Sequence, residues 1–154
     1  MIKSNKNIKI YNLKTKIINV LMISGKKSTG EKILLKSVKK LQKLSPKHFK
    51  TLIQMAIINS TSTFKLNEQI VKKGKRKTVR SIPSFVATDQ FRIMLSLKLI
   101  KDAALKGKGS NEFYESLSNE IIMASSLKGQ SINVKTDLQK QILANKRYLA
   151  KFHW

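Results

Sequence analysis

The sequence predicts a mainly α-helical domain of about six helices, with a protruding β-hairpin arm between the third and fourth helices. Apolar residues recur with helical spacing over most of the 154-residue chain, and Gly, Ser and Pro interrupt this spacing at several points. Strand-like alternation is confined to about residues 64–86. A chain of this length supports one hydrophobic core. We therefore expect a single domain over residues 13–154, preceded by a basic extension over residues 1–12.

The first two helices are placed by their apolar faces and by the residues that bound them. Residues 1–11 show no clear period and are rich in Lys and Asn, so we expect an extended basic arm. The first helix is expected over residues 13–23 and the second over residues 28–44. Ser28 and Glu31 have the spacing of a capping box, in which each side chain satisfies a backbone N–H at a helix start.

The remaining helices follow from similar signals. Ser45-Pro46 predicts the start of a third helix, which ends near Asn59. Asp89 is expected to cap a strongly apolar fourth helix at the centre of the core. A fifth helix is predicted over residues 111–127 and a sixth from Thr136 to near the C-terminus.

The alternating segment predicts the hairpin arm. Two β-compatible runs, KLNEQIV and TVRSIPSFV, flank the basic sequence KKGKRK. Pro83 weakens the second strand, and the connection is expected to exceed two residues, so an isolated ribbon fits better than a broad sheet. Six basic residues fall within nine positions: Lys72, Lys73, Lys75, Arg76, Lys77 and Arg80. These charges repel one another unless a polyanion approaches, and we expect nucleic-acid contact.

The amino-acid composition indicates which class of partner the chain binds. The chain holds 32 Lys and Arg against 8 Asp and Glu, a formal net charge of +24. Residues 1–50 carry 14 basic residues and one acidic residue, so the basic footprint lies toward the N-terminal side. Nucleic acid is the expected partner, because each cation placed near a phosphate releases counterions. No apolar run approaches the roughly 18 residues that would span a membrane.

Catalysis and cofactor binding have little support in the sequence. There is no Cys, and the two histidines, His48 and His153, are far apart. The eight carboxylates show no His-carboxylate or metal-ligand spacing. GKKST at residues 25–29 suggests a phosphate-binding P-loop, but the required Gly is replaced by Val20 and no strand precedes it. Lys26 and Lys27 at a helix start can instead hold an RNA phosphate. We expect a non-enzymatic protein without cofactor or metal.

Four stretches together resemble the family of small-subunit ribosomal protein seven. They are ISGKKSTGEKIL from Ile23, the basic segment ending in RSIP at Pro83, FRIMLSLKLIKDAA from Phe91, and the terminal ANKRYLAKFHW. The resemblance implies a helical fold with a ribbon arm, binding to the 3′ major domain of small-subunit rRNA, and nucleation of head assembly. It also implies a position near exit-site tRNA and the mRNA exit, beside neighbouring head and platform ribosomal proteins.

The expected contact residues come from the resemblance and from charge. By position, the resemblance assigns rRNA contacts to Lys26, Lys27, Ser28, Thr29, Arg92, Lys98 and Lys146. Further rRNA contacts are expected from positive charge at Lys3, Lys6, Lys9, Lys72, Lys73 and Arg147. Trp154 is expected to contact rRNA through its ring, which can stack on a base. The arm residues expected nearest tRNA and mRNA are Lys75, Arg76, Lys77 and Arg80.

Alternative readings remain open from the sequence. One is a basic protein that binds nucleic acid without sequence preference, or a DNA-binding helical pair, although the second helix is lysine-rich and Arg-free. Another is an amphipathic protein of a membrane surface. The bias toward Lys, Ile and Asn suggests a mitochondrially encoded member in the small subunit of the mitochondrial ribosome, with a plastid or the bacterial cytoplasm as the alternative. The N-terminal sequence does not resemble an imported presequence.

Overall fold

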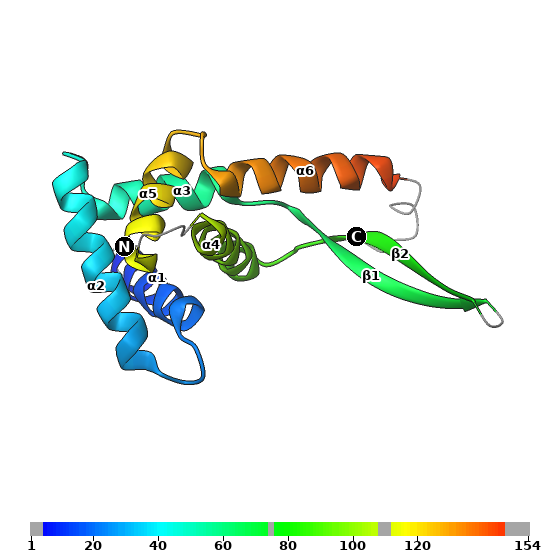
Figure 1. Ribbon diagram of the computed structural model, residues 1–154, viewed down its shortest axis with the longest axis horizontal. Helices are drawn as coiled ribbons and strands as arrows, with labels where there is room; N and C mark the ends of the chain where they lie inside the picture. Colours follow the sequence, from blue (N-terminus) through cyan, green and yellow to red (C-terminus); the bar gives the residue numbers. More distant parts are fainter. Residues whose placement is uncertain (1–4, 74–75, 108–111, 147–154) are drawn as a thin grey trace.

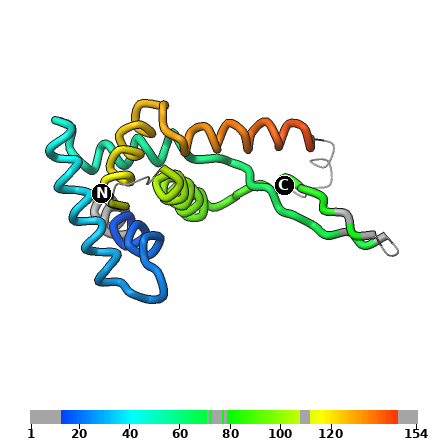
Figure 2. Tube along the Cα trace, viewed as in Figure 1, coloured from blue at the N-terminus to red at the C-terminus, as the bar shows by residue number. Residues whose placement is uncertain are grey.

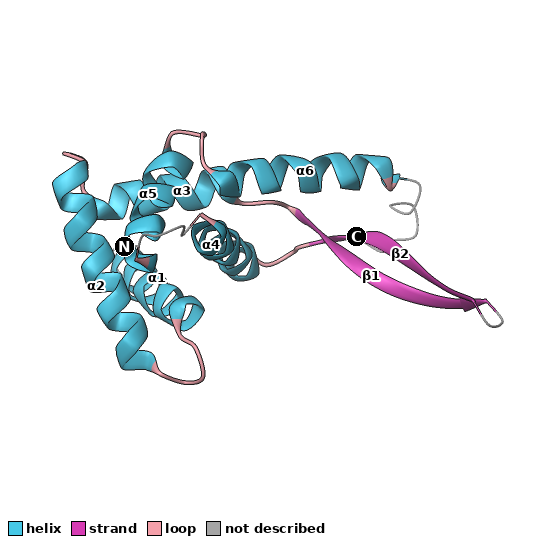
Figure 3. Ribbon diagram, in the orientation of Figure 1, coloured by secondary structure: helices cyan, strands magenta, loops and turns pink. Residues whose placement is uncertain are grey.

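Six helices and one two-stranded ribbon form the part of the chain that the computed structural model describes, residues 5–73, 76–107 and 112–146 (Figure 1). Their order is α1 (Asn5–Leu21), α2 (Lys27–Leu44), α3 (Phe49–Ser60), β1 (Phe64–Lys73), β2 (Arg76–Phe85), α4 (Asp89–Lys106), α5 (Phe113–Ser125) and α6 (Gln130–Ala144). Figure 3 shows α1 to α5 gathered at one end, the ribbon projecting from them, and α6 extending in the same direction as the ribbon. The predicted fold class is confirmed.

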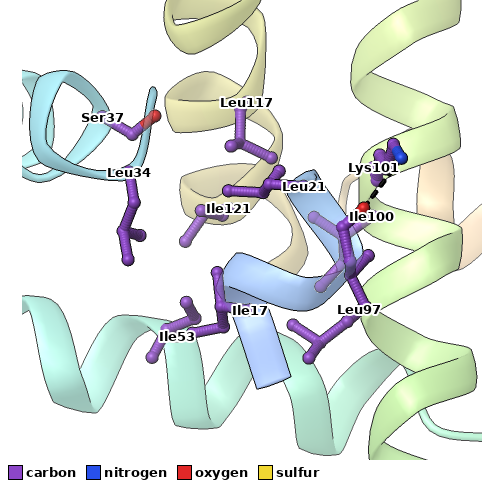
Figure 4. A pocket seen from close by; sticks show the side chains of 11 residues that line it. Ile17, Leu21, Leu34, Ser37, Ile53, Leu97, Ile100, Lys101, Leu117 and Ile121 are labelled. Atoms are coloured by element: carbon purple, nitrogen blue, oxygen red, sulfur yellow. Dashed lines mark hydrogen bonds between the residues drawn. The ribbon is translucent and has the colours of Figure 1, made fainter. Parts of the chain in front are cut away.

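The hydrophobic core lies between the first five helices. Apolar side chains from α1 to α5 converge on one point, among them Ile17, Ile53, Leu97 and Ile121 (Figure 4). The void left between them is small, about 20 Å³, with room for about one water molecule. Helix α6 packs outside this cluster, where it contacts α3, α4, α5 and β1. The packed helices therefore form the body from which the arm projects.

The arm is an antiparallel ribbon of two ten-residue strands. Pairing runs without interruption from Phe64 opposite Phe85 to Lys73 opposite Arg76. Only residues 74 and 75 separate the strands, so the prediction of a longer connection was wrong. Pro83 lies within β2 opposite Leu66, in a ribbon whose two strands each pair on one side only, where a missing N–H is tolerated. Figure 2 shows the ribbon extending away from the helices.

Several predicted helix starts were wrong. Helix α1 begins at Asn5, so residues 5–11 are helical where an extended arm was expected. Helix α2 begins at Lys27 with no side-chain cap, and the expected capping box is not formed. The start of α3 lies at Phe49, where the His48 Nδ1 accepts a hydrogen bond from the Lys50 N–H at 3.3 Å. Ser45 accepts instead from Lys47 in the preceding turn.

The starts of the later helices also differ from those predicted. Thr88 occupies the N-cap of α4, and Asp89 lies in its first turn. Helix α5 runs over fewer residues than expected. Helix α6 begins at Gln130, six residues before the predicted Thr136. Its cap comes from another helix: the Glu120 carboxylate on α5, 7% exposed, accepts hydrogen bonds from the Ser131 N–H at 2.8 Å and the Ser131 hydroxyl at 2.7 Å.

Candidate nucleic-acid interface

The turn between α1 and α2 presents the predicted GKKST segment. Ser24 and Gly25 have positive φ values of 51° and 75°, which turn the chain sharply after α1. Lys26 occupies the N-cap, and residues 27–29 form the first turn of α2, all of them exposed. The Lys27 N–H donates to the Gly25 carbonyl at 2.9 Å, and no side chain caps the helix, so the N–H groups of Ser28 and Thr29 and the partial positive charge of the helix start lie beside two lysines. The segment can therefore receive a phosphate group.

Gly30 allows this turn to lie close to the body. A Cβ at Gly30 would lie 3.3 Å from the Ile18 carbonyl oxygen on α1, so a larger residue would crowd the crossing of α1 and α2. A cavity of about 110 Å³ lies under the turn, lined by Leu21, Ile33 and neighbouring residues. Small-molecule sites usually measure about 300–1,000 Å³. The cavity is too small for a cofactor of ordinary size.

Two lysines on α2 have carboxylate partners at the start of α5, the N-cap Glu112 and Glu115 in the first turn, that the sequence did not reveal. The Lys40 Nζ donates to the Glu115 Oε1 at 2.9 Å, and this hydrogen bond raises the pKa of Lys40 above its usual value. The Lys36 Nζ lies 3.9 Å from the Glu112 Oε2 and 5.2 Å from the centroid of the Tyr114 ring. These two lysines are thus partly neutralised by their own chain, unlike the pair at the start of α2.

The arm carries the predicted basic residues at its distal end. Lys72 faces Lys77 across the two strands, and both are exposed. Arg80 is exposed and lies opposite Gln69 on the other face of the ribbon. Lys73 and Arg76 form the last described pair, with side chains that are not described, and Lys75 lies outside the described residues. The predicted tRNA and mRNA contact residues that the structure describes, Arg76, Lys77 and Arg80, therefore lie in β2 on the projecting part of the ribbon.

Arg92 is held at the base of the arm by its own chain. Its Nε donates to the Val86 carbonyl at 2.7 Å, and its Nη1 lies 3.2 Å from the Asp89 Oδ1. The guanidinium carbon is 5.3 Å from the centroid of the Phe85 ring. Only 24% of the side chain is exposed. The structure thus gives this predicted rRNA contact an intramolecular role that links the second strand to α4.

A second cation contact supports the same junction. The Lys65 Nζ on β1 lies 5.2 Å from the centroid of the Phe91 ring on α4. The Phe64 and Phe85 rings meet edge to face with centroids 5.6 Å apart, and the Val86 N–H donates to the Thr63 carbonyl at 2.9 Å. Both strands are therefore tied to the start of α4, which fixes the direction of the arm.

The other predicted contact residues are dispersed over the chain. Lys98 is exposed on α4 and Lys146 is exposed after the end of α6. Lys6 and Lys9 belong to α1, although their side chains are not described. Lys3, Arg147 and Trp154 lie outside the described residues. The structure brings together the α1–α2 turn residues in one group and the arm residues in another, and these two groups are well separated in Figure 1.

Two further lysines are used inside the fold. Lys101 donates to the Val20 carbonyl at 2.7 Å, near the end of α1 (Figure 4). Lys135 donates to the Asn59 carbonyl at 2.6 Å, near the end of α3, and burial lowers the pKa of Lys135. Both contacts place a cation at the negative end of a helix dipole. Part of the basic excess is therefore structural.

The described residues offer no metal centre. Across residues 5–73, 76–107 and 112–146, no three His, Asp or Glu side chains are grouped as metal ligands would be. His48, the one histidine in these ranges, serves as a helix cap. No helix in this part of the chain is long and apolar enough to cross a membrane.

Together, the fold and its charge define a small, strongly basic, mainly helical protein with a β-ribbon arm. Residues 2–146 match the family described as Ribosomal protein S7p/S5e, and the chain belongs to this family. Its role is that of a structural protein of the small ribosomal subunit, in a class of proteins that are not enzymes.

Three relatives show how far the similarity extends. The chain is 34% identical to "Small ribosomal subunit protein uS7" of Mycoplasma mobile over 148 residues, which cover 94% of this chain and 90% of the relative. It is 30% identical to "Small ribosomal subunit protein uS7c" of Euglena gracilis, over 90% of this chain and 86% of the relative. It is also 30% identical to "Small ribosomal subunit protein uS7" of Colwellia psychrerythraea, over 92% of this chain and 86% of the relative. The predicted family is confirmed.

Proposed function

We propose that this protein binds the 3′ major domain of small-subunit rRNA, nucleates assembly of the subunit head, and lies near exit-site tRNA and the mRNA exit. The observation that carries the proposal is the distal half of the arm. Residues 69–80 hold six basic residues and no acidic one, on a ribbon that projects from the body. Phosphates would relieve the repulsion between these charges, which favours a nucleic-acid partner.

The α1–α2 turn supplies a second group of phosphate contacts in this proposal. The Lys26 and Lys27 side chains lie beside the N–H groups of Ser28 and Thr29, which no side chain caps, so side chains and backbone can donate to the same phosphate. Contacts of this kind provide affinity and orientation but carry little sequence information. Specificity would come from the shape of folded rRNA, matched by the fixed distance between the turn and the arm.

The finer points of partner and compartment rest on other grounds. Neighbouring head and platform ribosomal proteins are proposed from the family. The mitochondrial ribosome is proposed from the bias of the sequence toward Lys, Ile and Asn. Sequencing the mitochondrial genome of the source organism would test the compartment directly, because the gene should be found there.

Binding to two RNAs tests the main proposal. The purified protein is titrated with the isolated 3′ major domain of small-subunit rRNA and with an unrelated structured RNA of equal length, at two salt concentrations. We expect a preference of about a hundredfold for the rRNA domain that persists at moderate salt. Equal affinities that fall together as salt rises would instead describe a nonspecific nucleic-acid-binding protein and would contradict the proposal.

Two matched variants separate local contacts from overall charge. Lys26→Gln/Lys27→Gln and Lys36→Gln/Lys40→Gln both change two lysines on or beside α2 and lower the charge equally. The first pair should reduce the slope of log K against log salt by about 1.4–1.8, the value expected for two lost phosphate contacts. The second pair should change it less, because Glu112 and Glu115 already engage these lysines. Equal effects would contradict the assignment of the turn.

A further inference from the structure

The register of the arm sorts its side chains onto two faces. Because successive side chains of a strand point to opposite sides, cross-strand pairs two residues apart share a face. One face carries, from base to tip, Phe64 with Phe85, Leu66 with Pro83, Glu68 with Ser81, Ile70 with Val79, and Lys72 with Lys77. This face starts with pairs that pack at the base of the arm and ends with a pair of lysines.

Ile70 and Val79 form an exposed aliphatic pair on this face. They lie directly opposite each other and are 65% and 59% exposed, whereas Pro83, nearer the base, is buried. Large aliphatic side chains contribute to stability by burial, and this pair remains largely open to solvent. The pair therefore has apolar surface available for a partner.

The surroundings of the pair indicate what that partner is. Lys72 and Lys77 occupy the next position on the same face, about 7 Å further along the strands. Glu68 and Ser81 share this face on the side of the base, whereas residues 69–80 toward the tip hold six basic residues and no acidic one, so an anionic partner is favoured on the side of the tip. Apolar side chains cannot bind phosphate, but they can pack against a base or a ribose. An anion that also offers apolar surfaces at this spacing is a nucleotide chain.

We propose that Ile70 and Val79 form an apolar platform for an unstacked nucleoside of single-stranded RNA, while Lys72 and Lys77 hold the adjacent phosphate. Single strands expose base faces that a protein can contact. In an A-form duplex the bases are stacked, and the major groove is too narrow for side chains to read. The inference rests on the proposed RNA-binding function and adds the type of RNA and the two residues that select it.

Conservative substitutions test the platform. Ile70→Thr/Val79→Thr removes apolar surface while keeping two β-branched residues that suit a strand. Ile70→Val/Val79→Ile keeps the apolar surface, and Ile58→Thr alters an isoleucine of matched exposure, 66%, on α3. The full-length variants are titrated with a single-stranded uridine oligonucleotide of about twelve nucleotides, with a duplex of the same length, and with the 3′ major domain of the rRNA.

The expected result is specific to single strands. The Thr/Thr variant should bind the single strand roughly tenfold more weakly and the duplex within about twofold of wild type. Its salt dependence should match that of wild type, whereas Lys72→Gln/Lys77→Gln should lower the salt slope. The Val/Ile exchange and Ile58→Thr should bind as wild type does.

Three results would overturn the platform. Unchanged binding of the single strand by the Thr/Thr variant would show that the aliphatic pair does not contact the RNA, and a protein neighbour would then be the partner of the pair. An equal loss on the single strand and the duplex would indicate a general change in the arm. Weaker binding of the single strand by the Val/Ile variant would show that the apolar surface of the pair does not determine the affinity. Failure of the proposed function is a separate result, in which the wild-type protein shows no preference for the rRNA domain over unrelated structured RNA.

Discussion

Arg92 is predicted to anchor the arm to α4, and replacing it by Gln tests this role. The hydrogen bond from its charged Nε to the Val86 carbonyl, at 2.7 Å, contributes about 1.5–3 kcal/mol. The contact with the Phe85 ring adds about 0.5–1 kcal/mol. The pair with Asp89 adds little, because the Asp89 side chain is 87% exposed. The Gln side chain can replace part of these contacts, so we expect the junction between the arm and α4 to lose about 2 kcal/mol of stability in Arg92→Gln.

Hydrogen exchange at the base of the arm measures this loss. The Val86 N–H donates to the Thr63 carbonyl at 2.9 Å, so its exchange reports opening of the junction. A loss of about 2 kcal/mol corresponds to a rise of roughly thirtyfold in the exchange rate of Arg92→Gln. Arg80→Gln removes an equal charge from the exposed part of the arm and should leave this exchange unchanged.

RNA binding distinguishes an anchor from a phosphate contact. An anchor positions the arm, so Arg92→Gln should weaken binding to the rRNA domain without altering the slope of log K against log salt. A direct phosphate contact would instead lower that slope by about 0.7–0.9. Unchanged exchange at Val86 together with a reduced slope would refute the anchoring role and restore Arg92 as an RNA contact.

Three further predictions concern the packing of the helices. Glu120→Ala should lower the free energy of unfolding by about 3 kcal/mol in urea, because two N–H groups and the Ser131 hydroxyl lose a buried acceptor; a loss below about 1 kcal/mol would argue against the cap. Gly129→Ala should lower the free energy of unfolding by about 1–3 kcal/mol, because the added Cβ would lie 2.5 Å from the Glu120 Oε1. The double variant Glu120→Ala/Gly129→Ala should lose less stability than the sum of the two single variants, because the carboxylate that clashes is then absent. Strict additivity of the two losses would contradict this clash. Burial lowers the pKa of Lys135 in the folded state below its usual 10.5, so the folded protein releases this proton at a lower pH than the unfolded chain does. The free energy of unfolding of wild type should therefore rise relative to that of Lys135→Met as pH rises toward 10.5. A constant difference in the free energy of unfolding between about pH 8 and pH 10 would contradict this prediction.

The features predicted well from the sequence are those set by local pattern. Helical spacing identified the six helices, and alternation identified the ribbon between α3 and α4. The helix starts were predicted poorly because their caps are not all local. Glu120 lies ten residues before the start of α6 and reaches it only through the packing of α5 against α6. A single sequence cannot reveal a cap of this kind, and the Thr136-Asp137 signal was followed instead.

The candidate interface shows the same division. The GKKST segment and the run of basic residues in the arm could be proposed as contacts from the sequence alone, because both stand out as local patterns. The sequence could not show which cations have partners within the chain. Arg92 is held by Val86 and Phe85, and Lys40 by Glu115, through contacts that only the folded arrangement creates. Exposed aliphatic residues in a strand are likewise indistinguishable from core residues until the register is known.

The distribution of acids and bases explains how one chain can be both stable and strongly basic. The described ion pairs place carboxylates next to cations on the body and at the base of the arm, where Glu115 meets Lys40 and Asp89 meets Arg92. Residues 69–80 of the arm include no acidic residue, and no side chain caps the start of α2. The ion pairs with a partly buried cation thus lie where elements pack, whereas the α1–α2 turn and the distal arm carry basic residues without a described carboxylate partner. A short RNA could contact only one of them, so simultaneous contact requires a large folded RNA. In the proposed function, the contacts at the base of the arm would hold the two surfaces apart, and the shape of the RNA would then contribute to specificity.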